Sequence, residues 1–268
     1  MDPLPPPAPP SPAPGSRRAP VLTLQVSTLS LAEAVLQVLA WAEAGESRSV
    51  CAANVHMVME AWDDPGFRDL VNGADLVTPD GVPLVWALRW QGRVQERVYG
   101  PDLMLETCRL AELRNLPIGL YGSREAVLAK LVDRLRARFP ALRIVYAHSP
   151  AFRPLTEQET AGIVEAIRRS GARILFVGLG CPKQERWMAA HREDVSAVML
   201  GVGAAFDFHA GTLPQAPGWM QRLGLEWLFR LIQEPGRLWL RYLKHNPRFL
   251  ALLCLQRLRR PPRPRPHP

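Results

Sequence analysis

The chain has few cysteines and none of the compact motifs that mark several large enzyme classes. Its four cysteines lie far apart without a Cys-x-x-Cys pair, so the sequence predicts neither a zinc site nor a disulfide framework and fits a reducing compartment. Neither a Gly-x-Ser-x-Gly nucleophile motif nor a Walker phosphate loop occurs. Serine hydrolases of the α/β type and P-loop nucleotide hydrolases are therefore excluded.

Long apolar runs are also absent. No uncharged apolar run reaches the roughly 18 residues that a membrane-spanning helix needs, so we expect no such helix. Residues 1–20 contain nine prolines and no apolar core of a signal peptide, which predicts a disordered lead. With 268 residues, the chain is long enough for one sizeable domain with appendages, but short for two domains.

Acidic residues are scarce in the C-terminal part of the chain. From Gln215 onward there are eleven basic residues and only two acidic ones, a local charge of +9, whereas the rest of the chain contributes −1 to the net charge of +8. A basic segment of this kind attracts either nucleic acid or an anionic membrane, and charge alone does not choose between them.

From Val21 onward, short β-rich runs alternate with longer helical periods. This alternation is typical of βαβ units around a mostly parallel sheet. We therefore predict a single Rossmann-like α/β domain over residues 21–223, a helical appendage over 224–260 and a disordered tail over 261–268. The predicted strands are 21–26, 49–53, 75–78, 117–121, 143–147, 173–177 and 197–202. The predicted helices are 30–44, 65–72, 82–90, 102–115, 124–138, 157–170 and 183–192.

The predicted appendage is rich in Trp, Leu and Arg, and we expect Pro235 and Pro247 to cut it into three short helices. In the first and last pieces apolar residues share one face, as in helices that lie on a membrane or pack on a core. These residues are Trp227, Leu228, Leu231 and Ile232, then Phe249, Leu250, Leu253 and Leu258. The basic charge and the nearby tryptophans favour membrane contact, and the high leucine content argues against RNA binding.

The most informative local feature is an apolar run that ends in Pro79-Asp80-Gly81. Pro79 fixes its own φ and biases Thr78 toward extended backbone, while Gly81 permits a sharp reversal into the next helix. The pattern predicts that Asp80 lies at the end of a strand, where ligands bind in open α/β sheets. The alternative is that Asp80 only caps the helix that begins near Val82.

Three further segments and a tail segment accompany this turn. They are Glu96-Arg-Val-Tyr-Gly-Pro-Asp-Leu103, Phe176-Val-Gly-Leu-Gly-Cys-Pro-Lys-Gln-Glu185, Gly201-Val-Gly-Ala-Ala-Phe-Asp-Phe208 and Glu226-Trp-Leu-Phe-Arg230…Glu234-Pro235…Arg237…Arg241-Tyr242. In this order and at these spacings, from about Val21 to about Tyr242, the chain resembles the WecG/TagA/CpsF family of bacterial glycosyltransferases.

The resemblance implies that Asp80 is the catalytic base and that the reaction needs no metal ion. The chain has no Asp-x-Asp motif, which holds a divalent ion in many sugar transferases, and Asp63-Asp64 is better explained by helix capping. Arg97 is then the candidate for holding the diphosphate, because its planar fork can bind two phosphate oxygens. Its alternative role is to pair with Glu96 or another surface acid.

The resemblance also implies that the tail folds over the site and brings Arg230, Arg237 and Arg241 to the leaving diphosphate. A plain phospholipid contact is the alternative for these arginines. Asn54 matches the Asn of the family's Thr-Pro-Asn element, but this chain has alanine where the threonine is usual. Any contact made by that threonine hydroxyl is therefore absent here.

Two glycine pairs, Gly178 with Gly180 and Gly201 with Gly203, each follow a predicted strand. Backbone can approach a nucleotide closely at such positions. Neither pair completes Gly-x-Gly-x-x-Gly, so the sequence does not support a dinucleotide fingerprint.

Further polar residues complete the set of candidates. Gln184 is expected to bind the sugar or the nucleobase, since the family motif places an active-site Gln here, and Glu185 beside it could be a surface residue of the first helical turn. Asp207 and His209 follow the second glycine pair, where ligand contact and turn capping are equally compatible with the sequence. His56 lies at an apolar helix start and is expected to be packed rather than catalytic.

These features together predict a cofactor-free, metal-independent, inverting glycosyltransferase of cell-envelope or exopolysaccharide synthesis. The resemblance implies a UDP-sugar donor (N-acetylmannosamine, its uronic acid or glucuronic acid) and a polyprenyl-diphosphate-linked saccharide as acceptor. We expect a cytoplasmic protein that binds the inner face of the cell membrane through its appendage and binds no nucleic acid; a homo-oligomer is compatible with the sequence. The alternatives are a non-enzymatic nucleotide-binding regulator and a nucleic-acid binder that uses the basic tail.

Overall fold

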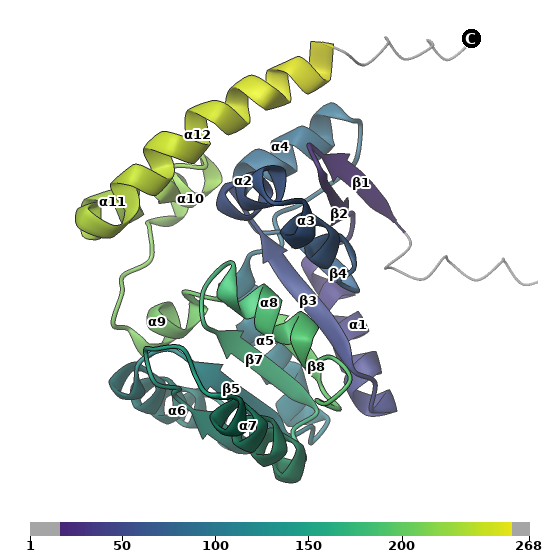
Figure 1. Ribbon diagram of the computed structural model, residues 1–268, viewed down its shortest axis with the longest axis vertical. Helices are drawn as coiled ribbons and strands as arrows, with labels where there is room; N and C mark the ends of the chain where they lie inside the picture. Colours follow the sequence, from purple (N-terminus) through teal and green to yellow (C-terminus); the bar gives the residue numbers. More distant parts are fainter. Residues whose placement is uncertain (1–16, 259–268) are drawn as a thin grey trace, which may run out of the picture.

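The computed structural model describes residues 17–258, which contain a six-stranded sheet between two layers of helices (Figure 1). The strand order is β4-β3-β8-β7-β5-β6 and all neighbouring strands are parallel, which confirms the predicted α/β fold. The strands are β1 (Arg18–Val21), β2 (Leu24–Ser27), β3 (Arg48–Ala53), β4 (Leu76–Pro79), β5 (Ile118–Gly122), β6 (Ile144–His148), β7 (Ile174–Gly178) and β8 (Val198–Gly201). The helices are α1 (Leu31–Ala44), α2 (Val55–Asp63), α3 (Pro65–Asn72), α4 (Val82–Trp90), α5 (Gly100–Leu113), α6 (Glu125–Arg138), α7 (Glu157–Ser170), α8 (Lys183–Ala190), α9 (Ala205–Ala210), α10 (Gly218–Arg222), α11 (Glu226–Gln233) and α12 (Pro235–Leu258).

Side chains of the sheet alternate between two apolar cores, one on each face. Along β7, Ile174 and Phe176 join one core, while Leu175 and Val177 join the other, and all four are fully buried. Helices α1, α5, α6 and α9 cover the first core, and α2, α3, α4, α7 and α8 cover the second. Burial on both faces explains why the strands are nearly continuous apolar runs in the sequence.

The predicted single strand over residues 21–26 is wrong. The structure has an antiparallel hairpin here, in which β1 pairs with β2 and forms a separate two-stranded sheet. The chain reverses at Leu22, whose φ of 53° is unusual for a residue other than glycine. Val21, Leu24 and Val26 are buried in the second core, so packing stabilises a turn that no turn residue signals.

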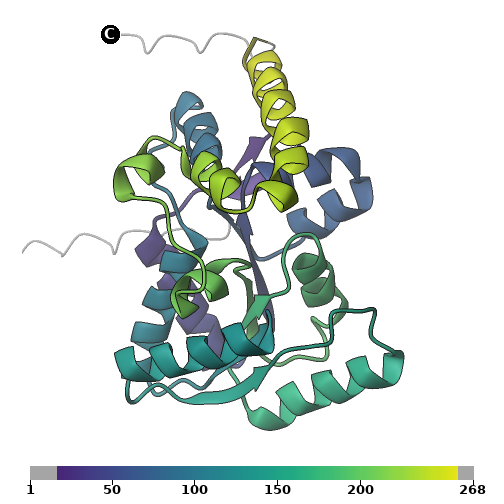
Figure 2. The same cartoon turned by 90° about the vertical axis from the view of Figure 1, so that its left-hand side faces the viewer.

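The C-terminal appendage ends in one long helix, although Pro247 was expected to divide it. Helix α12 is 24 residues long and continues through Pro247. An interior proline removes a backbone hydrogen bond, which normally ends a helix. Leu238 before Pro247 and Phe249 and Leu253 after it are buried, so packing on both sides of the proline stabilises the helix. Figures 1 and 2 show the long helix α12 beside α2, with α11 at the start of α12.

The apolar face predicted at the end of the appendage divides between two environments. Phe249 and Leu253 join the second core, whereas Leu250 and Leu258 remain exposed. Within residues 17–258, no helix combines the length and the apolar character needed to cross a bilayer. Residues 1–16 and 259–268, which include the predicted disordered tail, lie outside the described part of the chain.

Candidate active site

Four neighbouring strands end at one edge of the sheet, and each is followed by predicted site residues. Asn54 follows β3, Asp80 follows β4, and the two glycine pairs lie at the ends of β7 and β8. These strands are adjacent in the order β4-β3-β8-β7. The structure therefore brings together residues from distant parts of the sequence at an edge where parallel sheets bind ligands.

The Asp80 turn is held by the neighbouring strand. The backbone N–H groups of Asp80 and Gly81 both donate to the carbonyl of Ala53, at 2.9 and 3.0 Å. Asp80 Oδ1 accepts a hydrogen bond from Gly100 N at 2.8 Å, at the first residue of α5. Helix α4 starts after Gly81 without a side-chain cap, so Asp80 does not cap the helix that follows it.

Asp80 has an unusually basic carboxylate. Burial raises its pKa from 3.8 to about 6, partly opposed by the positive charge of Arg97, while the negative charge of Glu226 adds to the rise. Hydrogen bonds from Gly100 and from the side chain of Asn54 favour the ionised form. Asn54 also caps α2, because its Oδ1 accepts from Met57 N at 3.2 Å. Such a carboxyl group is ionised near neutral pH and still accepts a proton readily.

Arg97 lies directly beside Asp80. Its Nε donates to the Asp80 carbonyl, and its guanidinium carbon lies 3.8 Å from the centre of the Tyr99 ring. Its Nη2 donates to Oε2 of Glu226, the first residue of α11, at 2.7 Å. Of the alternative role, the pairing with Glu96 is wrong, because Glu96 instead accepts from Leu31 N at 2.7 Å, whereas a pairing with another acid is present, namely with the largely buried Glu226.

Glu226 and Tyr99 are site residues that the sequence reasoning did not select. The two oxygens of Glu226 accept from Arg97 and from the Tyr99 hydroxyl, the latter at 2.8 Å. Both residues belong to the segments that carry the family resemblance, and that membership was the available signal. Their contact links the appendage to the Asp80 turn, so α11 forms one wall of the site.

Gln184 is buried and connects the β7 and β8 ends of the site. Its Oε1 accepts from Gly180 N at 3.1 Å, and its Nε2 donates to Glu185 Oε1 at 2.8 Å. Gly201 packs so closely on Gln184 that a Cβ there would lie 2.9 Å from Gln184 Nε2. The suggestion that Glu185 is a surface residue is wrong, since it is 1% exposed and burial raises its pKa to about 7.

The remaining glycines of the two pairs shape the same edge. Gly178 lies against the ring of Phe206 on α9, where a Cβ would approach to 2.8 Å. Gly180 and Gly203 both have positive φ values, 80° and 51°. Gly100, outside the two pairs, lies between the Asp80 turn and the end of β8. A Cβ on Gly100 would lie 3.7 Å from Asp80 Oδ1 and 3.9 Å from the carbonyl of Val202.

Asp207 and His209 lie on α9 and contact other parts of the protein. The backbone carbonyl of Asp207 accepts from Thr212 N at 3.0 Å, and its carboxylate lies 3.5 Å from the Thr212 hydroxyl. His209 Nε2 lies 2.9 Å from the carbonyl of Pro101. The Asp207 contacts lie at the C-terminal end of α9 and agree with the capping alternative, whereas His209 contacts α5 and caps no turn.

The appendage places two of the three predicted arginines near this edge. Arg230 on α11 lies 5.8 Å from the ring centre of Phe208 and 3.5 Å from Glu234. Arg241 on α12 is half-buried. Burial is the main reason for the lowered pKa of His56, and the positive charge of Arg241 lowers this pKa further. His56 follows Asn54 closely in the chain. Arg237 belongs to α12, but its side chain lies outside the described part of the structure.

A hollow of about 450 Å³ lies elsewhere, between β6 and α7. It is lined by Tyr146, His148 and Glu159 among others. Strand β6 forms the sheet edge opposite β4, so this hollow is separate from the Asp80 turn.

Comparison with known proteins identifies the family. The family model described as "Glycosyl transferase WecG/TagA/CpsF family" matches residues 19–263. An N-acetylglucosaminyldiphosphoundecaprenol N-acetyl-beta-D-mannosaminyltransferase from Bacillus subtilis is 31% identical over 196 residues, which cover 72% of this chain and 74% of the relative. A protein of the same name from Bacillus spizizenii is 29% identical over 210 residues, 78% of this chain and 79% of the relative. The chain is therefore a glycosyltransferase and belongs to the WecG/TagA/CpsF family.

Proposed function

We propose that this glycosyltransferase moves N-acetylmannosamine from a UDP-sugar to a polyprenyl-diphosphate-linked saccharide that ends in N-acetylglucosamine. The names of the two Bacillus relatives specify this sugar and an undecaprenyl-diphosphate acceptor. The observation that carries the proposal is the Asp80 carboxylate, which lies at a strand end beside Arg97 and has a pKa of about 6.

Asp80 acts as the base in this proposal. The acceptor hydroxyl attacks the anomeric carbon of the donor while Asp80 takes its proton, and the bond from the anomeric carbon to the diphosphate breaks. A single displacement of this kind inverts the anomeric centre. One well-placed base contributes about 10²–10⁴-fold in rate.

The leaving diphosphate is stabilised by arginines in place of a metal ion. Arg97 is held at the site by Glu226, with its planar fork beside the Asp80 turn. Arg230, Arg237 and Arg241 supply further positive charge from the appendage. Charge-assisted hydrogen bonds from guanidinium groups suit the charge that develops on the leaving oxygen.

The remaining site residues hold the donor and the acceptor. The backbone near Gly178, Gly180, Gly201 and Gly203 approaches the diphosphate or the nucleobase, since a side chain there would meet Phe206 or Gln184 at two of these positions. Asn54 and Gln184 contribute amide groups to sugar binding, and Asp207 lies at the same edge on α9.

The appendage is the proposed contact with the inner face of the cell membrane. On α11 and α12, Ile232, Leu240 and Leu243 are 68%, 61% and 66% exposed, and Trp239 is 49% exposed. Apolar side chains beside basic ones are typical of helices that lie in a bilayer interface. A lipid-linked acceptor needs an enzyme at this surface, so the appendage would bring the site to its substrate.

Release of UDP tests this function. The purified chain is incubated with a panel of UDP-sugars and a short-chain polyprenyl-diphosphate acceptor, with and without EDTA. We expect acceptor-dependent UDP release with UDP-N-acetylmannosamine, at similar rates in both conditions. Release that stops in EDTA and returns with magnesium or manganese would contradict the metal-independent mechanism, and UDP-sugars that bind without turnover would favour the regulator alternative.

A further inference from the structure

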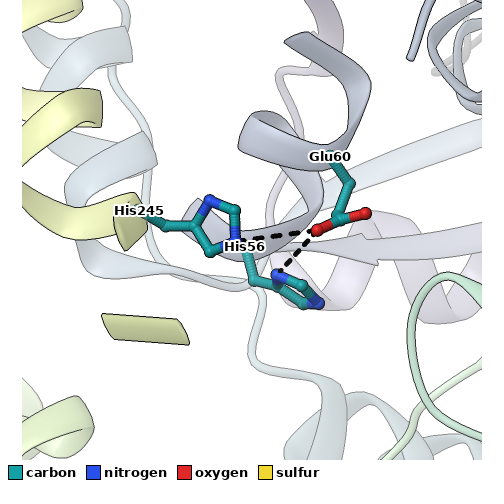
Figure 3. Close-up of side chains that lie close together, drawn as sticks. All are labelled: His56, Glu60 and His245. Carbon is teal, nitrogen blue, oxygen red and sulfur yellow. Dashed lines mark ion pairs between the residues drawn. The ribbon is translucent and has the colours of Figure 1, made fainter. Parts of the chain in front are cut away.

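Two histidines and one glutamate meet where the C-terminal helix packs on the core (Figure 3). His56 and Glu60 lie one turn apart on α2, and His245 approaches them from α12. Glu60 Oε1 lies 3.7 Å from His56 Nδ1 and 3.6 Å from His245 Nε2, and one ligand atom from each residue lies within 4.8 Å of the other two.

Hydrogen bonds do not account for this arrangement. Distances of 3.6 and 3.7 Å exceed normal hydrogen-bond lengths. Nδ1 of His245 is buried without a hydrogen-bond partner among the described residues, and the ring of His56 has only a marginal contact with the backbone of Cys181. His245 is 4% exposed, and unpaired buried polar atoms are rare because water is lost without compensation.

Glu60 is the acid that faces the two histidines, and the charged neighbours Arg241 and Lys244 are basic. An imidazole binds a metal ion through a neutral ring nitrogen. The nearby acid Asp63 is already paired with Lys244 at 3.6 Å and with Arg248.

The geometry suits a small ion. Ligand atoms bound at about 2.1 Å to a tetrahedral ion lie roughly 3.4 Å apart, which is close to the two measured distances. Two residues four apart on a helix present ligands on one face, as in many zinc sites. Imidazole and carboxylate together select zinc, nickel, cobalt or copper over magnesium and calcium, which prefer sites built of oxygen ligands alone.

We propose that His56, Glu60 and His245 bind a divalent transition-metal ion of the zinc class, which fastens α12 to α2. Water completes the coordination. The ion is structural and takes no part in sugar transfer. Phe249 and Leu253 also anchor α12 to the second core, so the helix remains in place, and transfer continues, when the ion is removed.

Cobalt binding to the full chain tests the site without any substrate. The protein carries Cys254→Ser, because the exposed thiol of Cys254 could capture metal, and it is treated with a chelator and dialysed before titration. We expect one Co²⁺ per chain, a spectrum of tetrahedral cobalt without thiolate bands, and a higher Tm with zinc. The variants are His56→Gln and His245→Gln, with Glu60→Gln as a third that retains both imidazoles.

The matched control is His191→Gln, because His191 also lies near a carboxylate, Asp194 at 3.5 Å, but belongs to no three-residue group among the residues described. Loss of an outer-shell partner alone weakens metal sites by about 10–100-fold, so loss of a direct ligand should weaken this one by more than about 100-fold. The control should bind normally. Absence of stoichiometric binding, or equal binding by the control and all three variants, would overturn the proposal. Because no substrate is present, failure here leaves the sugar-transfer proposal untouched.

Discussion

Replacing Asp80 with asparagine should separate the stability of the protein from its activity. The asparagine side chain would keep an oxygen that accepts from Gly100 N but could not ionise. Burial raises the Asp80 pKa from 3.8 to about 6. A pKa difference of about two units corresponds to about 3 kcal/mol of free energy, by which folding favours the neutral carboxyl group over the carboxylate. The residue retains some exposure, so about 3 kcal/mol is an upper limit.

The sign follows from the direction of the pKa change. Because the folded pKa lies above the unfolded one, the stabilising contribution of Asp80 is complete below pH 3.8 and is lost as the pH rises through about 6. At pH 8, Asp80→Asn should therefore be more stable than the natural protein by about 1–3 kcal/mol. The difference should shrink as the pH is lowered toward 4.

Urea unfolding at several pH values measures this difference, and UDP release measures activity on the same samples. We expect the variant to gain stability at pH 8 while turnover falls by about two or more decades, the range for loss of a general base. An equal or lower stability at pH 8, or a stability difference that does not change with pH, would refute the electrostatic reasoning. Near-normal turnover would refute the assignment of Asp80 as base.

Three other predictions follow from the site and the appendage. The kcat/KM of the natural protein should rise with pH through about 6 as Asp80 ionises, and a flat profile from pH 5 to 8 would contradict this. Arg97→Lys should not restore the activity lost in Arg97→Ala, because an ammonium cannot replace a bidentate fork; recovery of most activity would mean that Arg97 supplies only charge. Replacing the exposed Ile232 and Leu243 with serine should weaken flotation with anionic liposomes by about tenfold or more without changing the Tm. The control variant Leu113→Ser, which changes a residue on α5 that is 70% exposed, should not affect flotation. Equal flotation of both variants would argue against membrane contact through the appendage.

The strand ends of the site could be predicted because each has a strong local signal. An apolar run that stops at Pro79-Asp80-Gly81, or at a glycine pair, shows where a buried strand ends. Parallel strands then bring these ends to one edge of the sheet. These signals were sufficient to place Asp80 and the glycines near one another, and the resemblance to the family added Asn54.

The contacts between distant segments could not be predicted in this way. The pairing of Glu226 with Arg97, and the burial of Glu185 beside Gln184, depend on how α11 and α8 pack on the core. No periodicity in the sequence reports such packing. The family motifs contain these residues but do not specify their partners.

Local rules failed where tertiary packing was stronger. Pro247 predicts a helix end, yet Leu238 and Phe249 on either side of it are buried and the helix continues. Leu22 has no turn signal, yet it reverses the chain between two strands whose apolar residues are buried. In both places the apolar contacts outweigh the intrinsic preference of the backbone.

Mass spectrometry of the acceptor shows directly whether the chain transfers the sugar and whether Asp80 is needed. A short-chain N-acetylglucosaminyl-diphospho-polyprenol is incubated with UDP-N-acetylmannosamine and the chain, in parallel with Asp80→Asn. We predict that the acceptor gains the mass of one N-acetylhexosamine with the natural protein and gains almost none with the variant. Release of UDP without a heavier acceptor, or equal product from both proteins, would contradict the account.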